Sequence, residues 1–125
     1  MITTYKNLFD ILQILDVPEI PIVDSSFITS ALNLFGEKTR GYFSLQVVTE
    51  GSGVLTVNCL SSNIDDDALY SIPILAGGNE MPPILENHVA GSGLYSFHPP
   101  ISAYEKLEFI ASGDVTIKKA IICFQ

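Results

Sequence analysis

Three oxygen-bearing side chains alternate along one acidic loop, at Asn63, Asp65 and Asp67. Carboxylate and amide oxygens in such a pattern are ligands for a hard cation such as calcium. The continuation departs from an EF-hand, because position six is Ala68 instead of glycine and position twelve is Ile74 instead of glutamate. We interpret the segment as a solvated turn and predict no metal site, with these three residues as the only candidate ligands.

The two histidines, His88 and His98, are the side chains best suited to act as a base or a ligand near neutral pH. A serine hydrolase would also need an activated serine, and no Gly-x-Ser-x-Gly elbow occurs. Gly91-Ser92-Gly93 is better explained as a turn, and Gly51-Ser52-Gly53 lacks the residues that complete a phosphate loop. The sequence therefore predicts no catalytic residue, no cofactor and no enzymatic activity.

Paired carboxylates and exposed tyrosines are the side chains that could act on or bind a carbohydrate. Glu105 and Glu108 are separated by an odd number of positions, so a strand sends them to opposite faces, and we interpret both as surface charges. Without tryptophan, sugar stacking would depend on Tyr70, Tyr95 and Tyr104 being exposed together. Packing within or at the edge of a sandwich is the favoured interpretation for each tyrosine.

Cys59 and Cys123, the only cysteines, both stand in apolar runs typical of strands. We interpret them as buried, reduced thiols. A bridge between adjacent strands remains open, and the absence of clustered histidine partners excludes a zinc-site spacing.

The stretch that organises the chain runs from Gly41 to Ser62. Apolar residues occupy alternate positions on both sides of a glycine turn, at Phe43, Leu45 and Val47 and then at Leu55, Val57 and Cys59. Period two is the pattern of a half-buried strand. The stretch predicts two antiparallel strands joined as a hairpin whose apolar face other strands cover.

Further strands are indicated along the remaining chain, with turns at intervals of roughly ten residues. A second hairpin is predicted at Ser112-Gly113-Asp114. Pro73 places its strand at an edge or a bulge. The expected strands span residues 27–35, 69–75, 84–89, 94–98, 107–111 and 115–124. A total of about seven or eight strands predicts an all-β antiparallel sandwich, and we favour the jelly-roll type of sandwich.

The first 17 residues are dense in apolar side chains and predict a short helix that Pro18 ends. This segment either caps one end of the sandwich or forms an arm that docks on a neighbouring subunit. We therefore divide the chain into an N-terminal helix or arm with its connection, residues 1–21, and one sandwich domain, residues 22–125.

Composition limits the class of partner. The 125 residues carry six basic and fourteen acidic side chains, and a net charge of −8 argues against nucleic acid. No signal peptide or membrane span is indicated. With 47% hydrophobic and only 16% charged residues, part of the apolar surface is available for burial between subunits.

The strand segments Gly41 to Val47, Gly53 to Val57 and Pro99 to Leu107 resemble small jelly-roll proteins of tailed-bacteriophage heads. These are the cement, stabilisation or decoration proteins of the capsid, and the resemblance covers residues 22–125. It implies a homo-dimer or homo-trimer that binds the major capsid protein lattice. It also implies a protein made in the host cytoplasm and located on the virion surface.

Under this resemblance we expect contacts from the leading segment and from the irregular proline-rich loop. The expected interface residues are Leu8, Phe9, Ile11, Leu12, Met81, Pro82, Pro83, Ile84 and Leu85. The alternative function is a carbohydrate-binding β-sandwich module that recognises a host surface or a glycan.

Overall fold

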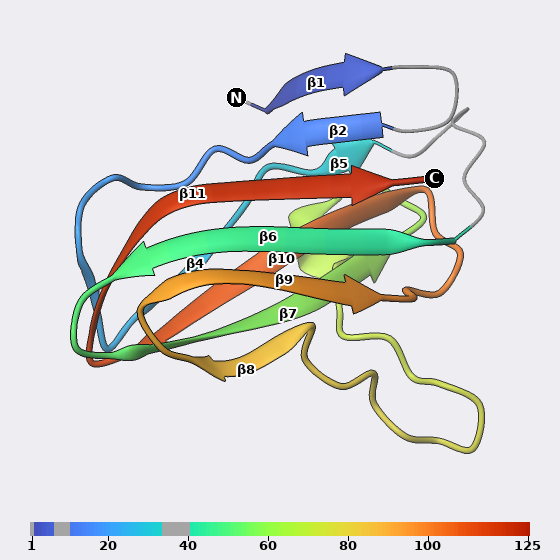
Figure 1. The fold of residues 1–125 in the computed structure, drawn as a ribbon. Helices are drawn as coiled ribbons and strands as arrows, with labels where there is room; N and C mark the ends of the chain where they lie inside the picture. The colour runs from blue at the N-terminus through green and yellow to red at the C-terminus, as the bar shows by residue number, and fades with distance from the viewer. Residues whose placement is uncertain (1, 7–10, 34–40) are drawn as a thin grey trace.

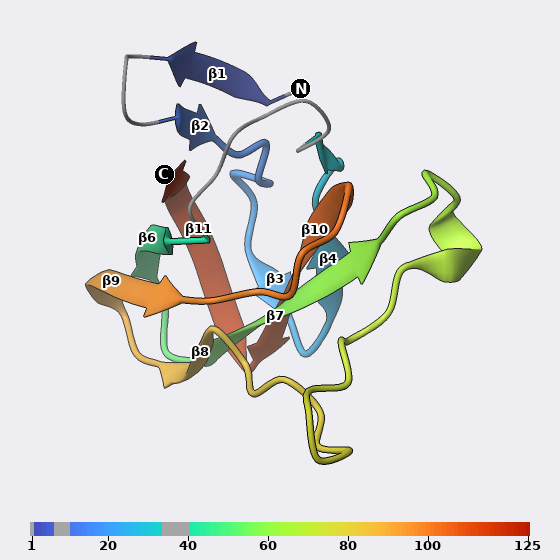
Figure 2. The same ribbon diagram turned by 90° about the vertical axis from the view of Figure 1, so that its right-hand side faces the viewer.

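A computed structural model describes residues 2–6, 11–33 and 41–125 and contains two antiparallel sheets packed face to face (Figures 1 and 2). The larger sheet contains β1 (Thr3–Lys6), β2 (Ile11–Ile14), β3 (Ile22–Val23), β6 (Phe43–Glu50), β9 (Gly91–Phe97) and β11 (Asp114–Phe124). The smaller sheet contains β4 (Ser26–Ile28), β5 (Leu32–Asn33), β7 (Val54–Ser62), β8 (Leu85–His88) and β10 (Tyr104–Ser112). A 3-10 turn, η1 (Asp67–Leu69), lies in the long loop between β7 and β8.

The strand order confirms the predicted all-β sandwich. With β1, β3 and β5 set aside, the larger sheet runs β2-β11-β6-β9 and the smaller β4-β10-β7-β8. Most consecutive strands in this set lie in opposite sheets, which gives the four-on-four nesting of a jelly roll. Within the described residues no helix is long and apolar enough to cross a membrane.

Alternation along the strands builds the core as expected. Leu45 and Val47 of β6 and Val57 of β7 have no exposed surface, while their sequence neighbours face outward. The ring of Phe43 stacks on Phe124 of β11 and also contacts Phe97 of β9, with centroids 5.2 and 5.3 Å apart. These rings belong to the larger sheet, and they form one buried cluster with Leu107 and Phe109 of β10 in the smaller sheet, so the two inner faces pack together as in a sandwich.

Both predicted hairpins are wrong. β6 pairs with β11 and β9, whereas β7 pairs with β10 and β8, so the glycine turn after Glu50 connects the two sheets. β10 and β11 are joined across the sheets in the same way through Gly113. Glycine permits a tight reversal both in a hairpin and in a connection between two sheets. Here each strand pairs with strands that are distant in the sequence. The strands are correct and their pairing is not.

Two strand predictions need correction. The segment 69–75 is not a strand: it follows η1 and makes only isolated bridges, one between Ser71 and Ser61 and one between Ile74 and Glu80. Pro73, which has no N–H to donate, stands between these two bridges. The segment 27–35 divides into β4 and β5, both paired with β10, and residues 34 and 35 lie outside the described part.

The predicted N-terminal helix is also wrong for the described residues. β1 and β2 pair with each other, and β2 continues the larger sheet along β11 from Ile121 to Phe124. An exposed edge of β11 offers a full ladder of backbone partners, and Ile11 and Ile14 are β-branched residues that favour a strand. The described strands of the leading segment, β1 and β2, are therefore part of the larger sheet (Figure 1).

Candidate functional site

The outer face of the larger sheet carries two adjacent rows of side chains that contain no charge. Each row contains one residue from each of the five strands β1, β2, β11, β6 and β9, aligned by the ladder registers. Residues that are Cα partners across a ladder point to the same face. The first row is Tyr5, Leu12, Cys123, Ser44 and Ser96, and the second is Thr3, Ile14, Ile121, Gln46 and Leu94. We call these ten residues the uncharged face.

Apolar side chains are exposed on the uncharged face. Leu94 is 68% exposed, Tyr5 55% and Leu12 37%, and Ile14 and Ile121 are half-buried beside them. Serine, threonine and glutamine supply the remaining polar atoms. An apolar surface with neutral polar groups and no charge has the composition found at the centre of protein interfaces.

Charges begin only beyond these two rows. Towards the glycine turns, the outer face carries Lys118, Lys119 and Glu50, and the Lys118 Nζ lies 3.8 Å from a Glu50 carboxylate oxygen. The smaller sheet has Lys106 and Glu108 on its outer face, and Lys106 forms an ion pair with Asp67. The outer face of the larger sheet is therefore charged near its glycine turns and neutral over the uncharged face, on a protein with a net charge of −8.

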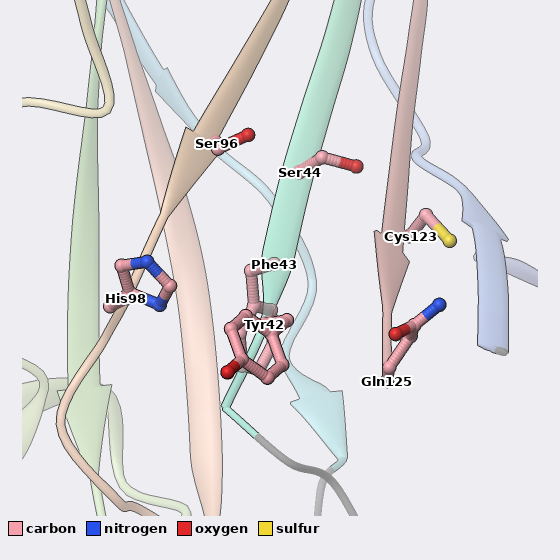
Figure 3. A pocket seen from close by; sticks show the side chains of 7 residues that line it. All are labelled: Tyr42, Phe43, Ser44, Ser96, His98, Cys123 and Gln125. Atoms are coloured by element: carbon pink, nitrogen blue, oxygen red, sulfur yellow. The ribbon is translucent and has the colours of Figure 1, made fainter. Parts of the chain in front are cut away.

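A shallow pocket of about 300 Å³ lies at one end of the uncharged face (Figure 3). Its lining combines aromatic rings with hydroxyl, amide and thiol groups, from Tyr42, Phe43, Ser44, Ser96, His98, Cys123 and Gln125. The Tyr42 and His98 rings meet edge to face, with centroids 5.6 Å apart and an interplanar angle of 74°. Ser44 and Ser96 lie side by side on β6 and β9.

Neither comparison of this chain with known proteins identified a relative: no family model and no curated protein matches it.

The two histidines are held in different ways. His98 is exposed, and its Nδ1 donates to the carbonyl oxygen of Gly41 at 3.1 Å, because a carbonyl can only accept. His88 is buried; its Nε2 donates to the Gly91 carbonyl at 3.1 Å, so in the neutral ring its Nδ1 accepts from the Tyr95 hydroxyl at 2.6 Å. His88 therefore positions β9 against β8, and both of its nitrogens are occupied.

The candidate metal ligands in the acidic loop do not converge. Asn63 Oδ1 accepts from the backbone nitrogen of Ala103 at 3.0 Å, Asp65 Oδ1 accepts from the Tyr70 hydroxyl at 2.8 Å, and Asp67 pairs with Lys106. Among the described residues no group of three acidic, histidine or cysteine side chains is arranged to hold a metal ion. The loop is fastened to its surroundings at three separate points.

The three tyrosines considered for sugar stacking do not gather in one place: Tyr95 lies in the larger sheet, whereas Tyr104 of the smaller sheet is near Tyr70. Burial, then neighbouring carboxylates and then Tyr104 raise the pKa of Tyr70. Tyr70 lies under the Lys106 ammonium, 4.4 Å from its ring centroid, and Tyr95 packs against His88. Tyr104 is half-buried on β10. Tyr42, which is 57% exposed and stands one residue before β6, was missed because it belongs to no motif and only the fold brings it to His98.

Glu105 is buried, which corrects its assignment as a surface charge. Glu105 and Glu108 do point to opposite faces, but Glu105 has no exposed surface. The Cys59 thiol donates to Glu105 Oε2 at 3.4 Å and the Ser102 hydroxyl to Oε1 at 3.3 Å. Burial raises the pKa of Glu105 to about 7, and these two hydrogen bonds offset part of the increase.

Cys59 and Cys123 lie in different sheets and form no disulfide with each other. Cys59 is buried, as predicted, and Cys123 is partly exposed beside the pocket. Burial, followed by the neighbouring Glu105 carboxylate, raises the pKa of Cys59 above its usual range. Cys59 is therefore a thiol donor inside the core.

The expected interface residues fall into three groups. Met81, Ile84 and Leu85 are buried in the core, so their side chains are not on the surface of the single chain. Ile11, Leu12, Pro82 and Pro83 are at least partly exposed. Leu8 and Phe9 lie outside the described residues. Of the nine, Leu12 belongs to the uncharged face, and sequence spacing gave no signal for its other members.

Proposed function

We propose that this protein is a non-enzymatic structural protein that binds a repeating protein lattice, as the capsid cement proteins it resembles do. The single observation that carries the proposal is the uncharged face: ten neighbouring positions on five strands without a charge. The chain as a whole has a net charge of −8. Such a gap in the charge pattern favours a surface that becomes desolvated against another protein.

The shape of the surface supports the same proposal. Five strands at a spacing of about 4.8 Å make a platform about 20 Å wide, which suits a flat protein surface better than a small ligand. The partner we propose is the major capsid protein, bound on the outside of assembled heads. Acidic loops elsewhere on the molecule would repel nucleic acid.

Pelleting with heads tests this function. Purified protein is mixed with heads assembled from the major capsid protein encoded in the same genome and then sedimented. We expect saturable co-sedimentation in a fixed ratio to capsid subunits, and no pelleting of the protein alone. A protein that stays in the supernatant at every concentration would contradict the proposal.

A second candidate function is carbohydrate binding, which the Tyr42–His98 pocket specifically favours. An exposed aromatic ring beside the hydroxyls of Ser44 and Ser96 offers stacking and hydrogen bonds without charge, as a neutral saccharide requires. On a glycan array, this function predicts signals that Tyr42→Ala removes and that Tyr70→Ala leaves unchanged. A blank array excludes it.

A further inference from the structure

The edge of the larger sheet is formed by β1, whose four residues are all exposed. In the described part of the chain β1 pairs only with β2, and it lies at the outer limit of the sandwich in both views (Figures 1 and 2). Among the described residues, Thr3 and Tyr5 point to one face of β1 and Thr4 and Lys6 to the other, and all four are exposed. A strand that buries so little is only marginally stabilised by its single ladder.

The other edge strands are protected in ways that β1 is not. β8 contains Asn87 with a left-handed φ of 53° and a register shift against β7. On β9, the Gly91 carbonyl accepts a hydrogen bond from His88 of β8 in the smaller sheet, and the His88 ring lies close to Gly93. β4 is only three residues long. Bulges, covering side chains and short length are the devices that prevent edge-to-edge pairing.

β1 is one residue longer than β4, and among the described residues it has neither a bulge nor a covering side chain. It contains no proline, glycine or left-handed residue, and its one charge, Lys6, is at the end of the strand. The eight residues of β1 and β2 include no acidic side chain, although the chain carries a net charge of −8. Two copies would therefore repel each other at most surfaces but meet at this edge without opposing carboxylates.

We propose that two copies of this chain associate by antiparallel pairing of their β1 strands, which joins the two larger sheets into one continuous sheet. Antiparallel pairing of a strand with its own copy is isologous and closes as a two-fold dimer. The inference deepens the proposed function, on which its biological meaning rests, because a dimer would present two uncharged faces to a lattice. Avidity then strengthens binding without any new contact.

A charge-swap experiment on the full chain tests the pairing. Thr4 is exposed on β1, and the pair that we propose is centred on this residue, so that Thr4 stands opposite its own copy. Thr4→Glu and Thr4→Lys each place like charges together, and we expect either variant to dimerise about fivefold more weakly or worse by sedimentation equilibrium. An equimolar mixture of the two should restore dimers, since opposite charges then face each other.

Ser52, exposed in the turn after β6, supplies the matched control. Ser52→Glu and Ser52→Lys should leave dimerisation unchanged. The inference is overturned by a wild-type monomer at every concentration, by a trimer, by Thr4 variants that dimerise normally, or by a mixture that fails to restore dimers. Co-sedimentation with heads is measured as a separate experiment. A dimer that does not bind heads contradicts only the proposed function, and a monomer that binds heads contradicts only the β1 pairing.

Discussion

The backbone nitrogen of Gly53 donates a hydrogen bond to the carbonyl oxygen of Asp114 at 2.9 Å, which fastens the turn after β6 to the turn before β11. These two turns carry the chain between the sheets in opposite directions. A Cβ added to Gly53 would lie 2.4 Å from the Ser112 carbonyl oxygen, a backbone atom. The contact therefore requires glycine for close approach, whatever the conformation of Gly53.

We expect Gly53→Ala to destabilise the fold by about 1–3 kcal/mol, because one of the two turns must move to relieve the overlap. Chemical denaturation measures the loss of the free energy of unfolding. Ser52→Ala, at an exposed position of the same turn, is the control and should change it by less than about 0.5 kcal/mol. Equal stability of the two variants would show that the turns do not pack in this way.

The buried carboxyl of Glu105 predicts that stability falls with rising pH. Its pKa is raised from 4.5 to about 7, so across that window the folded chain holds a proton that the unfolded chain has released. Raising the pH through this window therefore lowers the free energy of unfolding, by up to about 3 kcal/mol from this group.

Glu105→Gln removes this titration while keeping the shape of the side chain. We expect the variant to be more stable than the wild type at about pH 8 and close to it near pH 4.5. Glu108→Gln, on the outer face of the same strand, should retain the wild-type pH dependence. If Glu105→Gln and wild-type curves run parallel, the carboxyl does not titrate in this window.

The hydroxyl of Tyr95 is the partner of a buried imidazole nitrogen, and its removal should be costly. Tyr95→Phe leaves His88 Nδ1 without its donor, and we expect a loss of about 1–3 kcal/mol in thermal or chemical unfolding. Tyr42→Phe, which removes an exposed hydroxyl at the pocket, should leave stability nearly unchanged. A harmless Tyr95→Phe would mean that water or another group replaces the hydroxyl.

Much of the fold could be predicted because burial in a sandwich imposes period two on the sequence. Phe43, Leu45 and Val47 show this alternation, and the strand they predict is present. Pairing could not be predicted in the same way, since the glycines at 51 and 53 permit a hairpin or a crossing between sheets. The leading strands could not be predicted because a short, mainly apolar run such as Ile11 to Ile14 is compatible with a helix as well as with a strand.

The candidate site had no local signal. Tyr5, Leu12, Ser44, Ser96 and Cys123 become neighbours only through ladder registers that span the whole chain. A surface defined by the absence of charge is visible only after the register is known. The acidic loop, which has the strongest local pattern, turns out to be tied to Tyr70, Lys106 and Ala103.

The central claim is that the uncharged face binds the lattice, and one substitution tests it most directly. Leu94→Glu introduces a carboxylate at the most exposed apolar side chain of that face, and Ile74→Glu does the same at a comparably exposed position, 63% against 68%, in the loop between β7 and β8. In co-sedimentation with assembled heads, we expect Leu94→Glu to weaken binding by about tenfold or more, because an unpaired charge becomes buried, and Ile74→Glu to bind like the wild type. Wild-type binding by Leu94→Glu would contradict the claim.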